Sequence, residues 1–440
     1  MSVTRFFVLF VGLVFLTALS VCLYLLGWVL YIHWKYRHIP SPKIMGNFFM
    51  GHITELTEFE KKGRHLSMLF LKWKKEYGTV FVIFTMNRAI VVCLEPSIVK
   101  ELLVNSRSTK PAALYGKFHT VFGQRFVGNG LFSELNNDHW EKKRKMLNPP
   151  FKRKYLMDLM YQYNNSTEEL ISYLKLKADG KTEVHMAHEF NKVALDIIAK
   201  VAFGLDNLNV IHDDDAPFCQ AVAQSMKGLM HYIRTPFWKV DFRKESQAAM
   251  EKSRKAMIFM RNIAEKCILN RIEDIKEGRN YPEDILTHII KYSRSKDGMM
   301  GMEEMIDECF TFFIAGQETT AQLMSYTFEM IGRHPEIYKK LQEEVDCIIG
   351  EKPVISYDDI SKLEYMTLVF KEVLRYTPPA AGIQRQNVED IIINGYKIPA
   401  RSNIALSHYS LSRDERFWDK PEEFNPERFR EDNTSFDKEF

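Results

Sequence analysis

The chain has 440 residues, 46% of them hydrophobic and 13% aromatic, which is enough to bury one large core or two smaller ones and excludes a disordered composition. Its 60 Lys and Arg residues oppose 57 Asp and Glu residues, and the net charge of +3 gives no reason to expect a nucleic-acid partner. The cysteines have no C-x-x-C pair or regular spacing, which argues against a disulfide framework and structural zinc. They are Cys22, Cys93, Cys219, Cys267, Cys309 and Cys347.

The N-terminal stretch predicts a membrane anchor. Residues 6–32 carry no charged side chain and exceed the roughly 20 residues that a helix needs to cross a bilayer. A signal peptide has a shorter apolar region and a small-residue cleavage site, which this stretch lacks. Lys35, Arg37 and Lys43 follow the span, against Arg5 before it, so we expect residues 1–35 to anchor the chain with its bulk in the cytosol.

The rest of the chain predicts a mainly α-helical protein with a small β region. After the extended Ile39-Pro40-Ser41-Pro42 spacer, two β-rich stretches flank a turn at residues 86–88, and Pro96 then opens a helix. Further strands are expected at residues 390–393, 396–398 and 402–405, the first two joined by an Asn394-Gly395 turn. Helical periodicity dominates from about 138 to 376. The clearest helices are expected at residues 218–230, 248–276, 303–333 and 335–349. With no internal repeat or linker, we expect one domain over residues 36–440.

The helix starting near Glu303 contains residues that a plain core helix avoids. Ala315 and Thr319 are four apart and share one face, and Gly316 removes a side chain beside them, so a flat cofactor or a diatomic ligand could approach the backbone. Glu318 could feed protons to that face. The alternative is a glycine-kinked core helix with a solvated glutamate.

Three further elements stand out. Glu372 and Arg375 are three apart on a helix that stops at Pro378-Pro379, although such pairs are common on exposed helices. Arg428 lies between aromatic residues after a proline turn, in Phe424-Asn425-Pro426-Glu427-Arg428-Phe429. Trp140 and Arg144 are one helical turn apart, and their alternative reading is a surface pair.

In this order and spacing, the four elements resemble the cytochrome P-450 (haem-thiolate monooxygenase) family. Ala-Gly-Gln-Glu-Thr-Thr at 315–320 is similar to the family's oxygen-activation motif, Glu372-x-x-Arg375 to its helix pair, and Pro426-Glu427-Arg428-Phe429 to its arginine segment. The resemblance runs from the anchor to Phe440. It implies a cytochrome P-450 fold, a haem cofactor, a lipophilic substrate, and electrons from NADPH through a reductase in the endoplasmic reticulum membrane.

The resemblance also implies roles for residues. Glu318 and Thr319 are expected to deliver protons, while Ala315 and Gly316 would lie against the haem. Glu372, Arg375 and Arg428 would form a mutually satisfied charge network that holds the loop beneath the haem. The haem propionates would be contacted by Trp140, Arg144 and Arg385.

The chain also departs from the family pattern. The family's cysteine, in a Phe-x-x-Gly-x-Arg-x-Cys-x-Gly type of loop, is expected shortly after the arginine segment, and the chain ends at Phe440 before reaching it. None of the six cysteines stands in such a loop. We therefore expect a C-terminally truncated fold without the axial ligand, unable to turn over in this form. A non-catalytic, membrane-tethered binding or decoy protein is the competing reading, and a haem isomerase is disfavoured because Glu318 and Thr319 are retained.

Within the family, four stretches resemble the cholesterol 24-hydroxylase branch, which implies hydroxylation of a sterol side chain. They are residues 36–40, 120–125, 195–200 and 283–287. A substrate-lining loop would then contain Phe118, Val121, Phe122 and Phe126, although such an aromatic cluster is more often plain core.

A basic run follows Trp140 and has two readings, a solvated face or a docking surface for an acidic reductase. It comprises Lys142, Lys143, Arg144, Lys145, Lys152, Arg153 and Lys154. His185, His188 and Glu189 lack the spacing of a known metal motif, and we expect no metal site there.

Overall fold

The computed structural model describes residues 3–430 apart from residues 64, 106–107, 207, 214, 236 and 296–299. These residues form two compact units, residues 3–109 with 380–422 and residues 110–379 with 423–430. Phe440, the expected end of the truncated domain, lies outside the described part of the chain.

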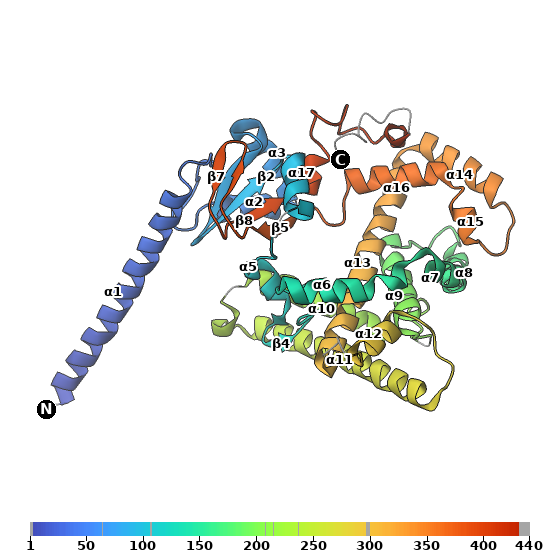
Figure 1. The fold of residues 1–440 in the computed structure, drawn as a ribbon, viewed down its shortest axis with the longest axis horizontal. Coiled ribbons are helices and arrows are strands. Elements are labelled where there is room, and N and C mark those ends of the chain that lie inside the picture. The colour runs from blue at the N-terminus through green and yellow to red at the C-terminus, as the bar shows by residue number, and fades with distance from the viewer. Residues whose placement is uncertain are drawn as a thin grey trace. The chain divides into compact units, whose positions relative to one another are not determined.

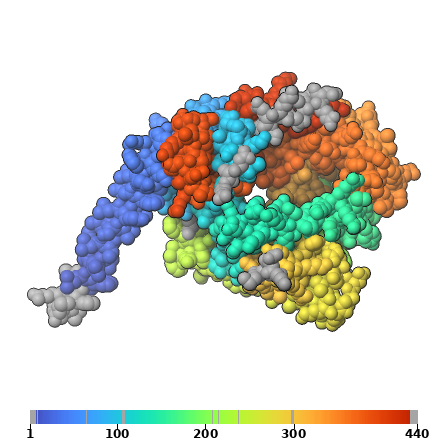
Figure 2. Space-filling view, viewed as in Figure 1, coloured from blue at the N-terminus to red at the C-terminus, as the bar shows by residue number. Residues whose placement is uncertain are grey.

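The first unit begins with the predicted anchor. Helix α1 (Val3–Lys35) continues well beyond the sheet that follows it (Figure 1). Within the described residues, it is the one helix long and apolar enough to cross a membrane. Figure 2 shows its side chains uncovered along most of its length. The most apolar part of α1 is not buried in the protein, and an apolar helix that is left uncovered has the character of a membrane segment.

The core of the first unit is a four-stranded sheet in the order β1-β2-β8-β5, in which β2 and β8 run parallel and the other neighbours antiparallel. A separate hairpin of β6 and β7 turns at Asn394 and Gly395, both with positive φ, as the predicted Asn-Gly turn requires. The strands are β1 (Val80–Thr85), β2 (Arg88–Cys93), β5 (Ile383–Gln386), β6 (Ile391–Ile393), β7 (Tyr396–Ile398) and β8 (Asn403–Leu406). The helices are α2 (Ile53–Lys61), α3 (Leu66–Tyr77), α4 (Pro96–Lys100), the π-helix η1 (Glu101–Asn105) and α17 (His408–Leu411).

The second unit is built around α13 (Met302–Arg333), which packs along α9 (Met186–Phe203) and also contacts α11 (Lys244–Glu277) and α16 (Glu364–Tyr376). Phe313 of α13 stacks on Phe203 with ring centroids 4.1 Å apart, inside the largest hydrophobic cluster. Figure 1 shows α13 running between these neighbours. Burial on several sides makes α13 the scaffold of this unit.

The remaining elements of the second unit are mostly helical. The helices are α5 (Ala112–Tyr115), α6 (Asn137–Leu147), α7 (Arg153–Asp158), α8 (Met160–Lys177), α10 (Pro217–Arg234), α12 (Ile285–Ser293), α14 (Pro335–Ile348) and α15 (Tyr357–Ile360). Short 3₁₀ turns are η2 (Gly116–Phe118), η3 (Pro149–Phe151), η4 (Trp238–Val240) and η5 (Pro426–Phe429). A small hairpin joins β3 (Thr120–Val121) and β4 (Gln124–Arg125).

The predicted fold class is confirmed, because the chain is mainly helical with small sheets and an apolar N-terminal helix. The four clearest predicted helices correspond to α10, α11, α13 and α14. The sequence reading missed β5 and the β3–β4 hairpin. Both are short and lack the alternation of a half-buried strand, so local sequence carries little signal for them.

Candidate functional site

The predicted site face on α13 is exposed in the middle of an otherwise well-buried helix. Ala315 and Thr319 are exposed, whereas Phe313 and Gln317 on other sides of the helix are buried. The Thr319 hydroxyl donates a hydrogen bond to the Ala315 carbonyl at 2.9 Å. This back-bond satisfies the hydroxyl within the helix and leaves the face open to a further group.

Gly316 packs directly against α9, a role that the sequence did not suggest. A Cβ at this position would lie 2.6 Å from Cγ1 of Ile198 on α9, a distance that packed carbons do not tolerate. Gly316 therefore allows α9 to approach α13 closely, and our expectation that its missing side chain makes room beside the Ala315–Thr319 face is corrected. Contact between Gly316 and haem stays a prediction.

Glu318 lies beside two cavities. One of about 290 Å³ is lined by α9, α10 and α13, including His188, Gln317 and Glu318. The other, about 570 Å³, lies against α10 and includes His231 and Arg234. Glu318 accepts a hydrogen bond from the Gln322 amide at 3.2 Å, so its carboxylate is held on the helix next to space that admits water.

The structure brings the predicted triad together. Glu372 is fully buried and accepts two hydrogen bonds from Arg375, at 2.7 and 2.8 Å. Arg428 donates to the same carboxylate at 3.1 Å, and the backbone N–H of Asn425 donates to it at 2.8 Å. Both guanidinium groups also donate to the Glu423 carbonyl. One carboxylate thus ties the end of α16 to the 423–428 segment in a hydrogen-bonded network.

The three residues predicted to contact haem propionates lie in different units. Trp140 and Arg144 are on α6 of the second unit, where Arg144 is exposed and the Lys110 ammonium lies 5.6 Å from the Trp140 ring. Arg385 is on β5 of the first unit, half-buried, and donates to the Gln384 carbonyl at 3.0 Å. Their shared role stays a prediction.

Three of the four predicted substrate residues belong to the hydrophobic core. Val121, Phe122 and Phe126 are almost fully buried, and Phe126 packs edge-on against Phe310 of α13. Phe122 sits at the β3–β4 turn with positive φ, surrounded by His231, Tyr232 and Trp238. Phe118 is half-buried. Val121, Phe122 and Phe126 are therefore core residues in this structure, and their contact with a substrate stays a prediction.

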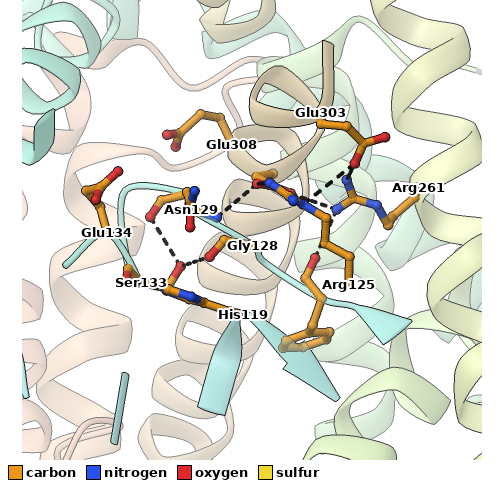
Figure 3. A network of polar contacts seen from close by, with 12 residues as sticks. His119, Arg125, Gly128, Asn129, Ser133, Glu134, Arg261, Glu303 and Glu308 are labelled. Carbon is orange, nitrogen blue, oxygen red and sulfur yellow. Dashed lines mark hydrogen bonds and ion pairs between the residues drawn. The ribbon is translucent and has the colours of Figure 1, made fainter. Parts of the chain in front are cut away.

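A second network of charged side chains, which the sequence analysis did not predict, is centred on Asp307 of α13. Figure 3 shows Arg125, Arg261 and Glu303 of this network. Arg125 binds the carboxylate of Asp307 with two hydrogen bonds at 2.9 and 2.6 Å. Arg261 of α11 donates to Asp307 at 2.8 Å and to Glu303 at 2.6 Å. The backbone N–H of Asn129 donates to Asp307 at 2.9 Å. Asp307 therefore fastens the 125–129 loop and α11 to α13.

Two glycines let this loop lie on α13. Gly128 has φ +44°, and a Cβ there would fall 2.1 Å from an Asp307 oxygen, while a Cβ at Gly130 would fall 2.2 Å from the Thr311 hydroxyl. Only glycine fits positions with such close approach. The Gly-Asn-Gly run at 128–130 is the one sequence feature that points to a close approach of this loop to α13. It is too short to predict that approach without the fold.

Glu308, next to Asp307, is fully buried among charged partners. It accepts a hydrogen bond from the Leu131 amide at 2.9 Å, and Lys143 of α6 lies 3.4 Å from its other oxygen and 3.3 Å from Glu134. Burial raises the pKa of Glu308 to about 7, although Lys143 opposes the rise. Lys143 is only 6% exposed, so it cannot be part of a solvated face or of a docking surface. Both interpretations of the basic run are therefore wrong for this residue.

The other six residues of the basic run are exposed, as both readings require. Lys145 pairs with Glu141 at 2.7 Å, and Arg153 with Asp358 at 3.3 Å. A helix with a 3.6-residue period must turn one member of a consecutive basic run inward, and that member is Lys143.

Three of the cysteines, Cys93, Cys267 and Cys309, are buried in the interior. Burial raises the pKa of Cys93 to about 12 and that of Cys267 to about 11, and it raises the pKa of Cys309 well above its usual range, so all three are held as thiols. Cys309 is the one cysteine of α13 and is fully buried, unlike Ala315 and Thr319.

The exposed Ala315–Thr319 face fits one side of a flat ring system, because a small side chain and a satisfied hydroxyl lie on it with no charged group between them.

The chain is a mainly helical protein with a helical body around one long core helix, a small mixed sheet and an N-terminal apolar helix that is long enough to span a membrane. The cytochrome P450 family model matches residues 40–440, and the chain belongs to this family. It is 28% identical to cytochrome P450 3A6 of Oryctolagus cuniculus, over 96% of this chain and 82% of that protein. It is 27% identical to cytochrome P450 4d2 of Drosophila melanogaster, over 89% and 79%. It is also 27% identical to the chloroplastic carotene epsilon-monooxygenase of Arabidopsis thaliana, over 83% and 68%.

As a member of this family, the chain carries its monooxygenase domain. The family uses haem, generally with electrons from NADPH through a reductase. Haem, when bound, supplies the activation of dioxygen, which consumes protons.

Proposed function

We propose that the chain hydroxylates the side chain of a sterol, as a cytochrome P450 of the cholesterol 24-hydroxylase type. The observation that carries the oxidative part is the exposed Ala315–Thr319 face beside Glu318 and its cavities. Glu318 would take protons from water in these cavities, and Thr319 would hold a proton at its hydroxyl next to the reacting oxygen. Ala315 would leave room for the substrate carbon.

The choice of a sterol rests on sequence resemblance. Of the four stretches similar to the cholesterol 24-hydroxylase branch, three have structural tasks here, since residues 120–125 form the β3–β4 hairpin, Ile198 packs on Gly316, and Asp284 caps α12. Two enzymes that act on the same substrate class would need the same scaffold to position the loop that binds the substrate. Phe118, Val121, Phe122 and Phe126 would then shape that loop.

We further propose that α1 anchors the chain in the endoplasmic reticulum membrane with residues 36–440 in the cytosol. The basic residues after the span support this orientation. Trp140, Arg144 and Arg385 would bind the haem propionates, and the triad of Glu372, Arg375 and Arg428 would hold the 423–428 segment below the ring. The exposed basic residues of α6 would steer an NADPH-dependent reductase.

The reduced carbon-monoxide difference spectrum tests this proposal, measured on the 440-residue chain and on a version extended through the family's cysteine loop. For the extended version we expect a thiolate-type band, followed by a side-chain hydroxylated sterol when reductase, NADPH and cholesterol are added. A folded chain that shows no haem spectrum and still binds cholesterol would instead identify a membrane-tethered binding protein.

The proton-delivery residues are tested by coupling. In the version extended through the cysteine loop, we expect Thr319→Ala to let oxygen consumption continue while product per oxygen falls about tenfold, because the variant loses the hydroxyl that holds the proton. Thr320→Ala is the matched control, since Thr320 is the neighbouring exposed threonine. Equal coupling in both variants would contradict the assignment of Thr319.

A further inference from the structure

An open groove of about 490 Å³ lies where the anchor helix meets the first unit. It is lined by His33, Tyr36 and Arg37 at the end of α1, by residues 39–42 with Ile44, and by Phe84 of β1. We call it the anchor-junction groove. All these residues belong to the first unit, so the groove is built within one compact body.

The residues that line the groove carry one positive charge, that of Arg37. The Arg37 guanidinium is exposed and lies 5.2 Å from the Trp34 ring, and no carboxylate of the described residues pairs with it. No Asp or Glu is among the residues that line the groove. An exposed arginine without an acidic partner is well suited to bind a phosphate, to which it donates in a bidentate manner.

His33 adds a second polar group. Its ring is stacked between Phe84 and Phe48, with centroid distances of 3.8 and 4.5 Å, and is therefore held in place. Its Nε2 atom is shielded from solvent and has no hydrogen-bond partner among the described residues. A buried nitrogen without a partner is rare in folded proteins, and a bound ligand would satisfy it.

An exposed apolar surface continues from the groove. Phe48 is 39% exposed, Phe49 is 49% exposed and Met45 is 77% exposed. On another side of α1, the Trp28 indole donates to the Asn87 carbonyl at 3.1 Å, which holds the β1–β2 turn beside the last turns of the span. Aromatic side chains such as Trp28 lie at the level of lipid headgroups, so the groove opens at that level.

From these observations we propose that the anchor-junction groove binds the phosphate of a membrane phospholipid through Arg37 and His33, with an acyl chain lying on Phe48 and Phe49. The proposal rests on membrane insertion of α1. A phospholipid fits better than a soluble anion, because only a lipid would also cover the apolar surface beside the groove. The carbonyl end of α1 opposes an anion weakly, and a charge-assisted pair with arginine outweighs that effect.

The test uses the full chain in phosphatidylcholine vesicles that contain a phosphatidylcholine analogue with a photoreactive headgroup. After illumination, we expect adducts concentrated at residues 33–44. Arg37→Gln should reduce them about tenfold, the effect of losing one charge-assisted hydrogen bond, and Arg37→Lys should restore part of the loss. The control is Arg88→Gln, because Arg88 is exposed and basic at the β1–β2 turn but does not line the groove.

Vesicle flotation separates the two proposals. If the chain does not float with the vesicles, the anchor and the groove proposals both fail. If it floats and the adducts do not depend on Arg37, only the groove proposal fails. Inorganic phosphate is then titrated into the chain in phospholipid-free detergent, followed by phosphorus NMR. Phosphate binding that depends on Arg37, together with loss of the adducts when phosphate is added to the vesicles, would identify a soluble-anion site and overturn the lipid assignment.

Discussion

Two buried charge networks of the second unit differ in how far apart their members lie in the chain. Glu372 and Arg375 are three residues apart on α16, and Arg428 follows 56 residues after Glu372. Arg125 and Asp307 are 182 residues apart and come from a hairpin and a long helix. The first network was recognisable from a short helical motif, whereas the second exists only because the fold brings distant segments together.

The networks also differ in composition. In the triad, one carboxylate serves two guanidinium groups, and a backbone carbonyl accepts from both. On α13, Asp307 pairs with Arg125 and Arg261, and the adjacent Glu308 pairs with Lys143. Each carboxylate also accepts from one backbone amide, and one Glu308 oxygen has no hydrogen bond within the described residues. The triad is thus the better satisfied network, and we expect it to tolerate substitution least.

Loss of the central triad carboxylate should have the largest effect. Glu372→Gln leaves two guanidinium groups buried without their counter-charge, and we expect a loss of about 4 kcal/mol in the free energy of unfolding, measured by denaturant titration. Glu343→Gln on the surface of α14 is the control and should change stability by less than about 1 kcal/mol. Similar effects of both substitutions would show that the triad does not hold this region.

Asp307→Asn should come next, with a loss of about 3 kcal/mol, because Arg261 is buried while Arg125 retains access to water. Limited proteolysis should then cleave within residues 119–134, which the substitution releases from α13. Asp358→Asn removes an exposed pair with Arg153 and serves as the control. Unchanged proteolysis would mean that the glycines, rather than Asp307, hold the loop.

Gly316→Ala tests the close packing of α13 on α9. Alanine in a helix interior normally stabilises by about 1 kcal/mol over glycine, yet here we expect a loss of about 2 kcal/mol, because the new methyl group meets Ile198. Combining it with Ile198→Ala should cost less than the sum of the single losses. Additive losses of stability, or a change in haem affinity alone, would instead indicate that Gly316 serves the cofactor and not the packing on α9.

Glu308 should give the smallest effect, visible as a pH dependence. Burial raises its folded-state pKa to about 7, above the roughly 4.3 of an unfolded glutamate. Between these values the folded chain holds more protons than the unfolded chain, so the stability contributed by protonated Glu308 is present at low pH and lost as the pH rises towards 7. Urea midpoints measured from pH 4 to 8 should fall less steeply in Glu308→Gln than in the unchanged chain. Parallel curves would show that Lys143 keeps Glu308 ionised throughout.

The sequence alone determined the features that depend on neighbouring residues. The apolar run predicted α1, the Asn394-Gly395 pair predicted the β6–β7 turn, and helical periodicity located α13 with Ala315 and Thr319 on one face. The three-residue spacing of Glu372 and Arg375 likewise predicted a pair on one face of α16.

Only the tertiary structure decided the features that depend on contacts between distant segments. Lys143 is buried although it belongs to a basic run, and Val121, Phe122 and Phe126 lie in the core. Gly316 leaves the space that Ile198 of α9 occupies. Composition and periodicity describe which side of a helix is buried, but the partner that buries it is set by packing across the whole fold.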